Sequence, residues 1–183
     1  MINLYAVIRF LHVLADIGLF FGNGLQLLGV VLLRRAITVD QARSINHVVE
    51  RVQGFTIVSV LMTLATGVYM TIAVWGFSTG WIQAALGVIF LIIMPMIAFV
   101  VEPRMKRISQ LLDDADGALP ETVVKRIYDP ILSAGTGAIL SALISIIFLM
   151  TTKPSLFTSV ITSAIIILLG LLAGFLAPRK SRR

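Results

Sequence analysis

Five long apolar stretches constrain this chain more than any other feature of its sequence. A helix of about 20 residues crosses the roughly 30 Å hydrocarbon core of a bilayer, and each stretch reaches that length. A lipid-exposed backbone must satisfy its own hydrogen bonds, and the stretches lack the alternation of membrane strands, so all five are predicted to be α-helices. The predicted spans are residues 10–33, 54–75, 81–101, 131–152 and 157–177.

The composition indicates the same class. Of the 183 residues, 58% are hydrophobic and 13% are charged, whereas soluble domains average about 45–50% apolar and about 25% charged residues. We therefore expect an all-α membrane protein in which residues 1–183 form one domain, a bundle of five transmembrane helices. The chain has no cysteine, which excludes disulfides, thiolate-held clusters and a cysteine nucleophile.

The basic residues predict an orientation. All Lys and Arg residues except Arg9 and Lys153 lie in the loops 34–53 and 102–130 or in the basic tail 178–183. Because short cytoplasmic loops carry the excess of Lys and Arg, both loops and the C-terminus are predicted to be cytoplasmic and the N-terminus to face outward. The same distribution explains the net charge of +6 without a nucleic-acid partner.

Three ionisable residues lie in the first predicted helix. Arg9, His12 and Asp16 are spaced by three and four residues, which places them on one helical face. An Arg or Asp at the middle of a membrane costs about 2.5–3.5 kcal/mol on insertion scales, so such residues usually face the bundle interior and have partners. This face is therefore the candidate functional site of the chain.

The chemistry of that face admits three interpretations. In the first, Asp16 accepts the Nδ1–H of His12 and leaves Nε2 free, an arrangement found behind many metal and haem ligands, with Arg9 meeting a haem propionate or another anion. In the second, the three side chains neutralise one another and hydrogen-bond to Ser and Thr of helices two and four. In the third, they form a proton or ion path that continues through Asn23.

Small residues at intervals of four predict close helix packing. Helix one has Gly18 and Gly22, and helix five has Gly170 and Gly174. Helix four carries a longer series. Its members are Ser133, Gly137, Ser141 and Ser145. Together these seams indicate a tightly packed bundle, or a face reserved for a partner subunit.

The loops have their own signals. The Thr-x-x-Gln pattern of residues 38–41 predicts a helix that starts at Val39 and leads into helix two. His47 on that segment is interpreted as a solvated interface residue. Pro95 is expected to kink helix three. In the 102–130 loop, two short amphipathic helices are expected to lie on the membrane face as a lipid-facing connector.

Four short motifs suggest a family. They are YAVIRFLHVLADIGLFFGN from Tyr5 onward, the pair Gly80-Trp81, the segment EPRMKRISQLL, and the segment FLMTTKP ending at Pro154. Over residues 4–154 the chain resembles a bacterial family of predicted integral membrane proteins of unknown function. Helix five lies beyond the usual end of that family. The resemblance implies a multi-pass protein of the bacterial cytoplasmic membrane.

That family is distantly similar to membrane proteins of the copper-resistance protein D type and to HemJ-type protoporphyrinogen oxidases, in which an early histidine of helix one is implicated in haem b binding. Only His12 and the Gly80-Trp81 pair carry over. The HemJ-type pattern has a lysine shortly after Gly-Trp, where this chain has Ala84 and Ala85. The resemblance therefore implies an analogy for haem b at His12 and not the oxidase activity.

No catalytic motif occurs in the sequence: there is no glycine-rich phosphate loop, no His-Glu-x-x-His and no Gly-x-Ser-x-Gly. No metal site is predicted. The leading expectation is a non-catalytic accessory or structural subunit that contacts the lipid bilayer and either other membrane subunits or a second copy of itself. The alternatives are a haem-b or redox-linked protein that uses His12 with Asp16, and a proton or ion path along helix one.

Overall fold

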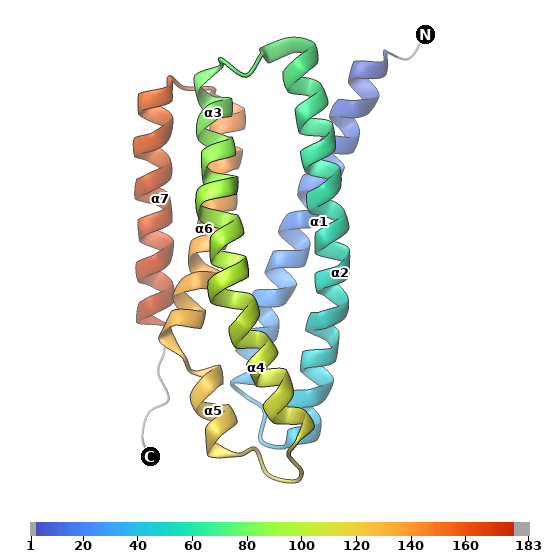
Figure 1. The fold of residues 1–183 in the computed structure, drawn as a ribbon, viewed down its shortest axis with the longest axis vertical. Helices are drawn as coiled ribbons and strands as arrows, with labels where there is room; N and C mark the ends of the chain where they lie inside the picture. Colours follow the sequence, from blue (N-terminus) through green and yellow to red (C-terminus); the bar gives the residue numbers. More distant parts are fainter. Residues whose placement is uncertain (1–2, 178–183) are drawn as a thin grey trace.

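The computed structural model describes residues 3–177 as a bundle of five long helices that run up and down (Figure 1). Each helix is long and apolar enough to cross a membrane, which confirms the predicted all-helical class. The described chain starts at one end of the bundle and finishes at the other. The predicted basic tail 178–183 lies outside the described residues.

The predicted spans fall on these five helices. The first is α1 (Leu4–Leu33), and the second is α2 (Val39–Met70), which continues as the π-helical turn η1 (Thr71–Trp75). The third consists of α3 (Gly80–Gly87), the π-helical stretches η2 (Val88–Ile93) and η3 (Met96–Val101), and α4 (Glu102–Asp113). A short helix, α5 (Glu121–Ile127), precedes α6 (Pro130–Thr152) and α7 (Leu156–Leu176).

Polar side chains start several helices as the sequence predicts. Thr38 Oγ1 accepts a hydrogen bond from Gln41 N at 3.3 Å, so the helix begins at Val39 and feeds the second span. Gln41 Oε1 accepts from Ile37 N rather than from the capping residue itself. At the end of α6, Lys153 adopts a left-handed conformation, φ 49°, and the chain turns into α7.

The small-residue seams pack helices of the same chain against each other. On α1, a side chain at Gly18 would meet Ser59 of α2, and one at Gly22 would meet Thr56. These contacts join α1 and α2 into a hairpin over much of their length. The seam of helix one is therefore filled by helix two.

The other seams join α6 to α7. A side chain at Gly137 would collide with the backbone of Gly170, and one at Gly174 would collide with the backbone of Ser133. The side chain of Ser141 lies against Gly170. With α3, these helices form a second group, whose core is built around Ala138, Ala142 and other buried residues of α6.

The third span continues beyond its predicted end at Val101. Pro95 lies between η2 and η3, where the helix widens into π-helical turns. The chain then passes through Pro103 without a break, and Arg104 Nη1 donates to the Val100 carbonyl at 3.0 Å. The two short helices expected in the 102–130 loop are present as α4 and α5. The first of them continues directly from the third span, and its lower end lies beside the start of α2 (Figure 1).

The apolar faces of α4 and α5 are buried in protein. Ile108 and Leu112 of α4 pack with Val123 and Ile127 of α5, and the cluster includes Leu33, the last residue of α1. These residues are almost fully buried. The expected lipid-facing connector is thus a folded cap. We call the end of the bundle that carries it, with the 34–38 connection, the basic end.

Hydrogen bonds lock this cap to the first loop. Val39 N donates to the Gly117 carbonyl at 3.0 Å, and Leu119 N donates to the Ile37 carbonyl at 3.1 Å. Arg43 Nη2 donates to the carbonyls of Leu112 and Ala115 at 2.9 and 2.8 Å. The two predicted loops therefore form one unit at the basic end.

Candidate functional site

His12 points from α1 across to α2. The side chain is buried, and its Nδ1 lies 2.9 Å from Thr66 Oγ1. The Thr66 hydroxyl donates to the Met62 carbonyl at 2.6 Å, so it is the acceptor for a proton on His12 Nδ1. Gly67 makes the approach possible, since a side chain there would stand 3.1 Å from His12 Cε1.

Asp16 faces the other nitrogen of the ring. Its Oδ2 lies 3.6 Å from His12 Nε2, and its Oδ1 accepts from Thr63 Oγ1 at 2.9 Å. The expected hydrogen bond from His12 Nδ1 to Asp16 was therefore wrong, because the ring turns its Nδ1 toward α2. With Nδ1–H donating to Thr66, Nε2 is the ring nitrogen that faces Asp16 Oδ2.

Arg9 takes no part in this cluster. It is exposed on α1, and among residues 3–177 no ion pair or hydrogen bond joins it to His12 or Asp16. The interpretation in which all three side chains neutralise one another is thus reduced to the pair, with Thr63 and Thr66 of α2 as its partners. Within that part of the chain, no hydrogen bond joins the pair to α6, the fourth predicted span.

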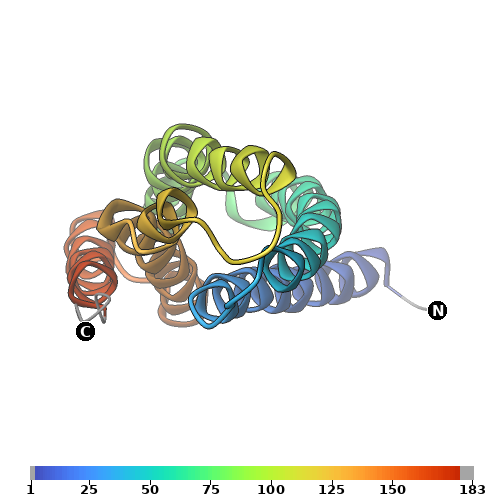
Figure 2. The ribbon, with the colours of Figure 1, turned by 90° about the horizontal axis from the view of Figure 1, so that it is seen from below.

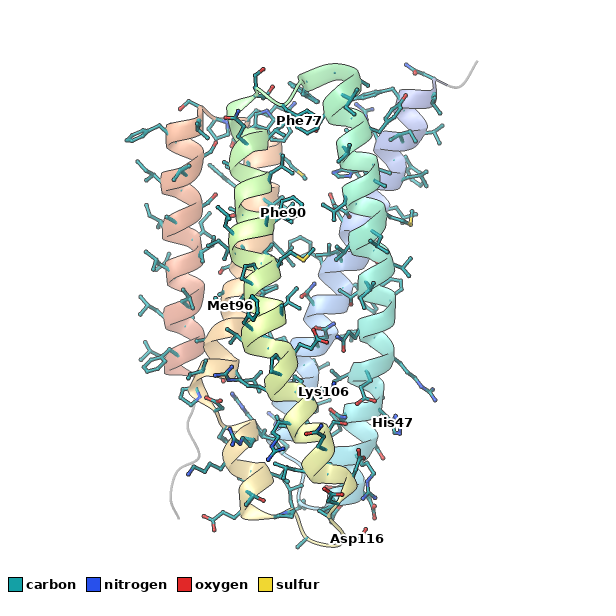
Figure 3. All side chains as sticks on the ribbon, in the orientation of Figure 1. His47, Phe77, Phe90, Met96, Lys106 and Asp116 are labelled. Atoms are coloured by element: carbon teal, nitrogen blue, oxygen red, sulfur yellow. The ribbon has the colours of Figure 1, made fainter. Side chains whose placement is uncertain are left out.

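The pair does not fit the haem ligand that the resemblance implies. An axial histidine needs one free ring nitrogen, and here Nδ1 meets Thr66 while Nε2 faces Asp16. His12 is 8% exposed and is covered by α2. His47 lies at the basic end, with its side chain exposed and 3.7 Å from Glu50 (Figure 3). Among residues 3–177, no three His, Asp or Glu side chains gather as a metal site.

Asp16 also lines a large internal chamber. The chamber has a volume of about 760 Å³ and lies between the α1–α2 hairpin and the group formed by the third span and α6. Seen along the bundle, α1, α2, the third span and α6 form a ring, and α7 lies outside it (Figure 2). The chamber extends along α2 from Thr63 to Asn46, which are 17 residues apart, or about 26 Å.

Polar side chains line the part of the chamber on α1, α2 and α4. Asn23 Nδ2 donates to the Leu19 carbonyl at 2.9 Å, and Gln26 Nε2 donates to Thr56 Oγ1 at 3.3 Å. The remaining polar lining residues are Asn46, Glu50, Gln53, Thr63, Glu102, Lys106, Ser109 and Gln110, with Thr136 of α6. This wall includes the carboxamides that interrupt the apolar stretches of α1 and α2.

The charged lining residues other than Asp16 lie toward the basic end. Glu50 Oε1 accepts from Asn46 Nδ2 at 2.8 Å and from Ser109 Oγ at 3.0 Å. Lys106 projects from α4 in the lower part of the bundle (Figure 3), and Glu102 precedes it by one turn. The chamber is therefore charged at its basic end and holds a single carboxylate, Asp16, at its far end.

The third span and α6 supply the apolar wall. Its residues include Ile89, Ile93, Ile97, Ile139, Leu140, Leu143, Ile146 and Met150. Leu61 of α2 and Met94 of the third span line the chamber and are also exposed on the surface. The chamber therefore reaches the surface of the bundle beside these two residues, and also beside Ile147 of α6, which lines it and is exposed.

The sequence revealed part of this site. The spacing of His12 and Asp16 was a usable signal, and the second interpretation expected Ser or Thr partners on helix two without identifying Thr63 and Thr66. The chamber itself was missed. The signal that could have found it is the series of carboxamides Asn23, Gln26 and Gln53 in otherwise apolar helices, because such residues turn toward a polar interior.

Comparison with known proteins gives one match. A family described as "Predicted integral membrane protein (DUF2269)" matches residues 6–154. The matched segment contains every residue that lines the chamber and ends just before α7. No curated protein and no solved structure matches the chain.

Proposed function

This chain belongs to the DUF2269 family of predicted integral membrane proteins, and we propose that it binds one lipophilic small molecule in the chamber between the α1–α2 hairpin and the third span. The observation that carries the proposal is the chamber itself, about 760 Å³ in volume, whose lining is largely apolar with polar side chains on α1, α2 and α4. Ligand pockets typically measure about 300–1,000 Å³ and combine apolar walls with a few placed polar groups.

The shape of the chamber supports an elongated ligand. It extends for about 26 Å along α2, close to the thickness of a hydrocarbon core. Where it reaches the surface, beside Leu61, Met94 and Ile147, its lining side chains are apolar. A lipophilic molecule dissolved in the bilayer can enter by this route without crossing water.

Photolabelling tests the proposal. A small neutral aryl diazirine in proteoliposomes should label chamber residues such as Ile93 and Ile139. Val60→Trp fills the chamber from α2 and should abolish that labelling. Val58→Trp is the matched control, because Val58 is exposed on the same helix and does not line the chamber. Equal labelling of the chamber residues in both variants would contradict the proposal.

The role of accessory or structural subunit has lost one of the observations behind it. That role was motivated by small-residue seams available to a partner, together with the absence of catalytic motifs. Gly18 and Gly22 are filled by α2, and the seams of α6 and α7 fill each other. Self-association through these seams would require the chain to unpack its own helices, so ligand binding is the better-supported function.

The proton path is the second candidate, and one observation favours it. The chamber gives Asp16 a polar-lined route to the basic end, past Asn23 and Gln26. Its Oδ2 lies 3.6 Å from His12 Nε2, and each of these atoms can accept and release a proton. Proton flux into liposomes that is unchanged in Asp16→Asn would remove this candidate.

We infer that the basic end is cytoplasmic. The support is the concentration of Arg and Lys in the 34–53 and 102–130 segments, on the side toward which α7 runs. The N-terminus then faces outward. The membrane proposed is the bacterial cytoplasmic membrane, which rests on the resemblance of the sequence motifs.

A further inference from the structure

We propose that the ligand of the chamber is a lipophilic cation whose charged group lies against Asp16. This inference rests on the proposed function and adds the charge of the ligand and the residue that recognises it. A carboxylate at the end of an apolar pocket attracts a cation strongly, because the low dielectric of the surroundings strengthens the interaction.

Asp16 is placed to receive such a group. Its side chain is 25% exposed although it lies on a membrane span, and it lines the chamber. Thr63 occupies Oδ1 with a hydrogen bond of 2.9 Å. Oδ2 has only His12 Nε2 beside it, at 3.6 Å, which is longer than a good hydrogen bond. One carboxylate oxygen is thus open to a second partner.

The surroundings supply no competing cation. On α1 the titratable neighbour of Asp16 is His12, and α2 presents Thr63 and Thr66. The third span above Glu102 and the whole of α6 line the chamber with uncharged side chains. The basic residue of the lining, Lys106, belongs to α4 at the other end, beside Glu102 and Glu50.

The exchange balances in charge and in protons. In this proposal the unoccupied pair is uncharged: His12 Nδ1–H donates to Thr66, and one further proton lies either on Asp16 Oδ2 or on His12 Nε2, which are 3.6 Å apart. A cation at Oδ2 displaces that proton, which leaves to the solution. His12 remains neutral, and the ligand charge is matched by the Asp16 carboxylate. Binding of one cation therefore releases one proton.

Two ions of the same shape and opposite charge test the inference. Tetraphenylphosphonium and tetraphenylborate are compared on the full-length protein by equilibrium dialysis against a detergent-matched reservoir. The wild type should bind the cation at least about tenfold more tightly than the anion. In weakly buffered solution, addition of the cation should release about one proton per bound ion, as the exchange requires.

Substitutions at Asp16 locate the recognition. Asp16→Asn keeps an acceptor for Thr63 and removes the charge, so it should lose the preference for the cation and the proton release. Asp16→Glu keeps the charge and should retain both. Asp116→Asn makes the same chemical change on an exposed loop outside the chamber and should behave as wild type.

The outcomes separate this inference from the proposed function. Binding of both ions that is blocked by Val60→Trp but indifferent to Asp16→Asn would overturn the cation site and leave the chamber as a binding site. Binding of neither ion, or binding that Val60→Trp does not affect, would overturn both. Proton release measured on the wild type needs no variant, and its absence during cation binding would also overturn the exchange.

Discussion

Two threonines of α2 hold the polar side chains of α1. Thr66 Oγ1 accepts a hydrogen bond from His12 Nδ1, and Thr63 Oγ1 donates one to Asp16 Oδ1. The sequence predicts the shared face of His12 and Asp16, because helical spacing alone decides it. It does not predict which ring nitrogen meets which partner, because that depends on how α1 and α2 are rotated against each other. Gly67 settles the rotation by leaving room for the imidazole.

The contact between His12 and Thr66 should stabilise the α1–α2 hairpin. In a double-mutant cycle of His12→Ala and Thr66→Val, we expect a coupling of about 0.6 kcal/mol and not more than about 1.7 kcal/mol, the range of hydrogen bonds between membrane helices. Unfolding in mixed detergent micelles measures it. Thr151→Val paired with His12→Ala is the control, since the Thr151 hydroxyl bonds only to carbonyls of its own helix. A coupling of zero would disprove the contact.

The buried position of His12 also predicts the absorption spectrum of the protein. Protein purified from haem-replete cells should show no Soret band, because His12 is buried against Gly67 of α2 and leaves no room for a haem at its ring. An absorption spectrum measures this directly. A Soret band that disappears in His12→Ala and persists in His47→Ala would contradict the arrangement and support the haem analogy.

Helix packing decides what each element can do. The lengths of the apolar stretches predict the five helices, and the small residues at intervals of four predict that these helices pack closely. The sequence of one helix does not show which helix packs against its small residues, because that depends on the shape of the facing helix. The same limit explains the error at α4. Its amphipathic pattern predicts a buried apolar face, and the pattern is the same whether lipid or the cap residue Val123 covers that face.

The seam between α6 and α7 is open to a direct test. Gly137→Ala should lower the stability by about 1–3 kcal/mol, the usual effect of overpacking, because the new methyl group meets the backbone of Gly170. Gly87→Ala is the matched control. No neighbouring atom lies within 4 Å of the added carbon there, and better helix propensity should leave stability unchanged or raise it by up to about 1 kcal/mol. Thermal unfolding in detergent compares them. Equal effects would refute the seam.

At the scale of the whole molecule, the bundle consists of two groups of helices joined at the basic end. The α1–α2 hairpin and the group of α3, α6 and α7 each pack tightly. The cap cluster around Leu33 and Ile108 connects them, and Leu19 of α1 also packs into the core built on α6. The chamber is the space that remains between the groups. A sequence pattern shows which faces of helices make contact better than it shows where the helices leave space between them. The carboxamides Asn23 and Gln26 therefore indicate a polar interior but do not reveal a chamber.

The orientation of the whole molecule can be measured because the chain has no cysteine. Single cysteines at Ser78, in the turn between η1 and α3, and at Asp116, on the opposite end, report the two sides. In intact cells, a membrane-impermeant maleimide should label Ser78→Cys and not Asp116→Cys, because basic loops remain cytoplasmic. The reverse pattern would show that the bundle is inserted the other way.

Native mass spectrometry tests the central claim most directly, namely that the chamber holds a lipophilic molecule. Protein extracted from its own membranes in a mild detergent should carry one small molecule per chain. The bound mass should persist in Val58→Trp and be absent from Val60→Trp, whose side chain fills the space beside Leu64 and Thr63. An adduct of equal occupancy in both variants, or a wild-type protein that carries none, would contradict the account.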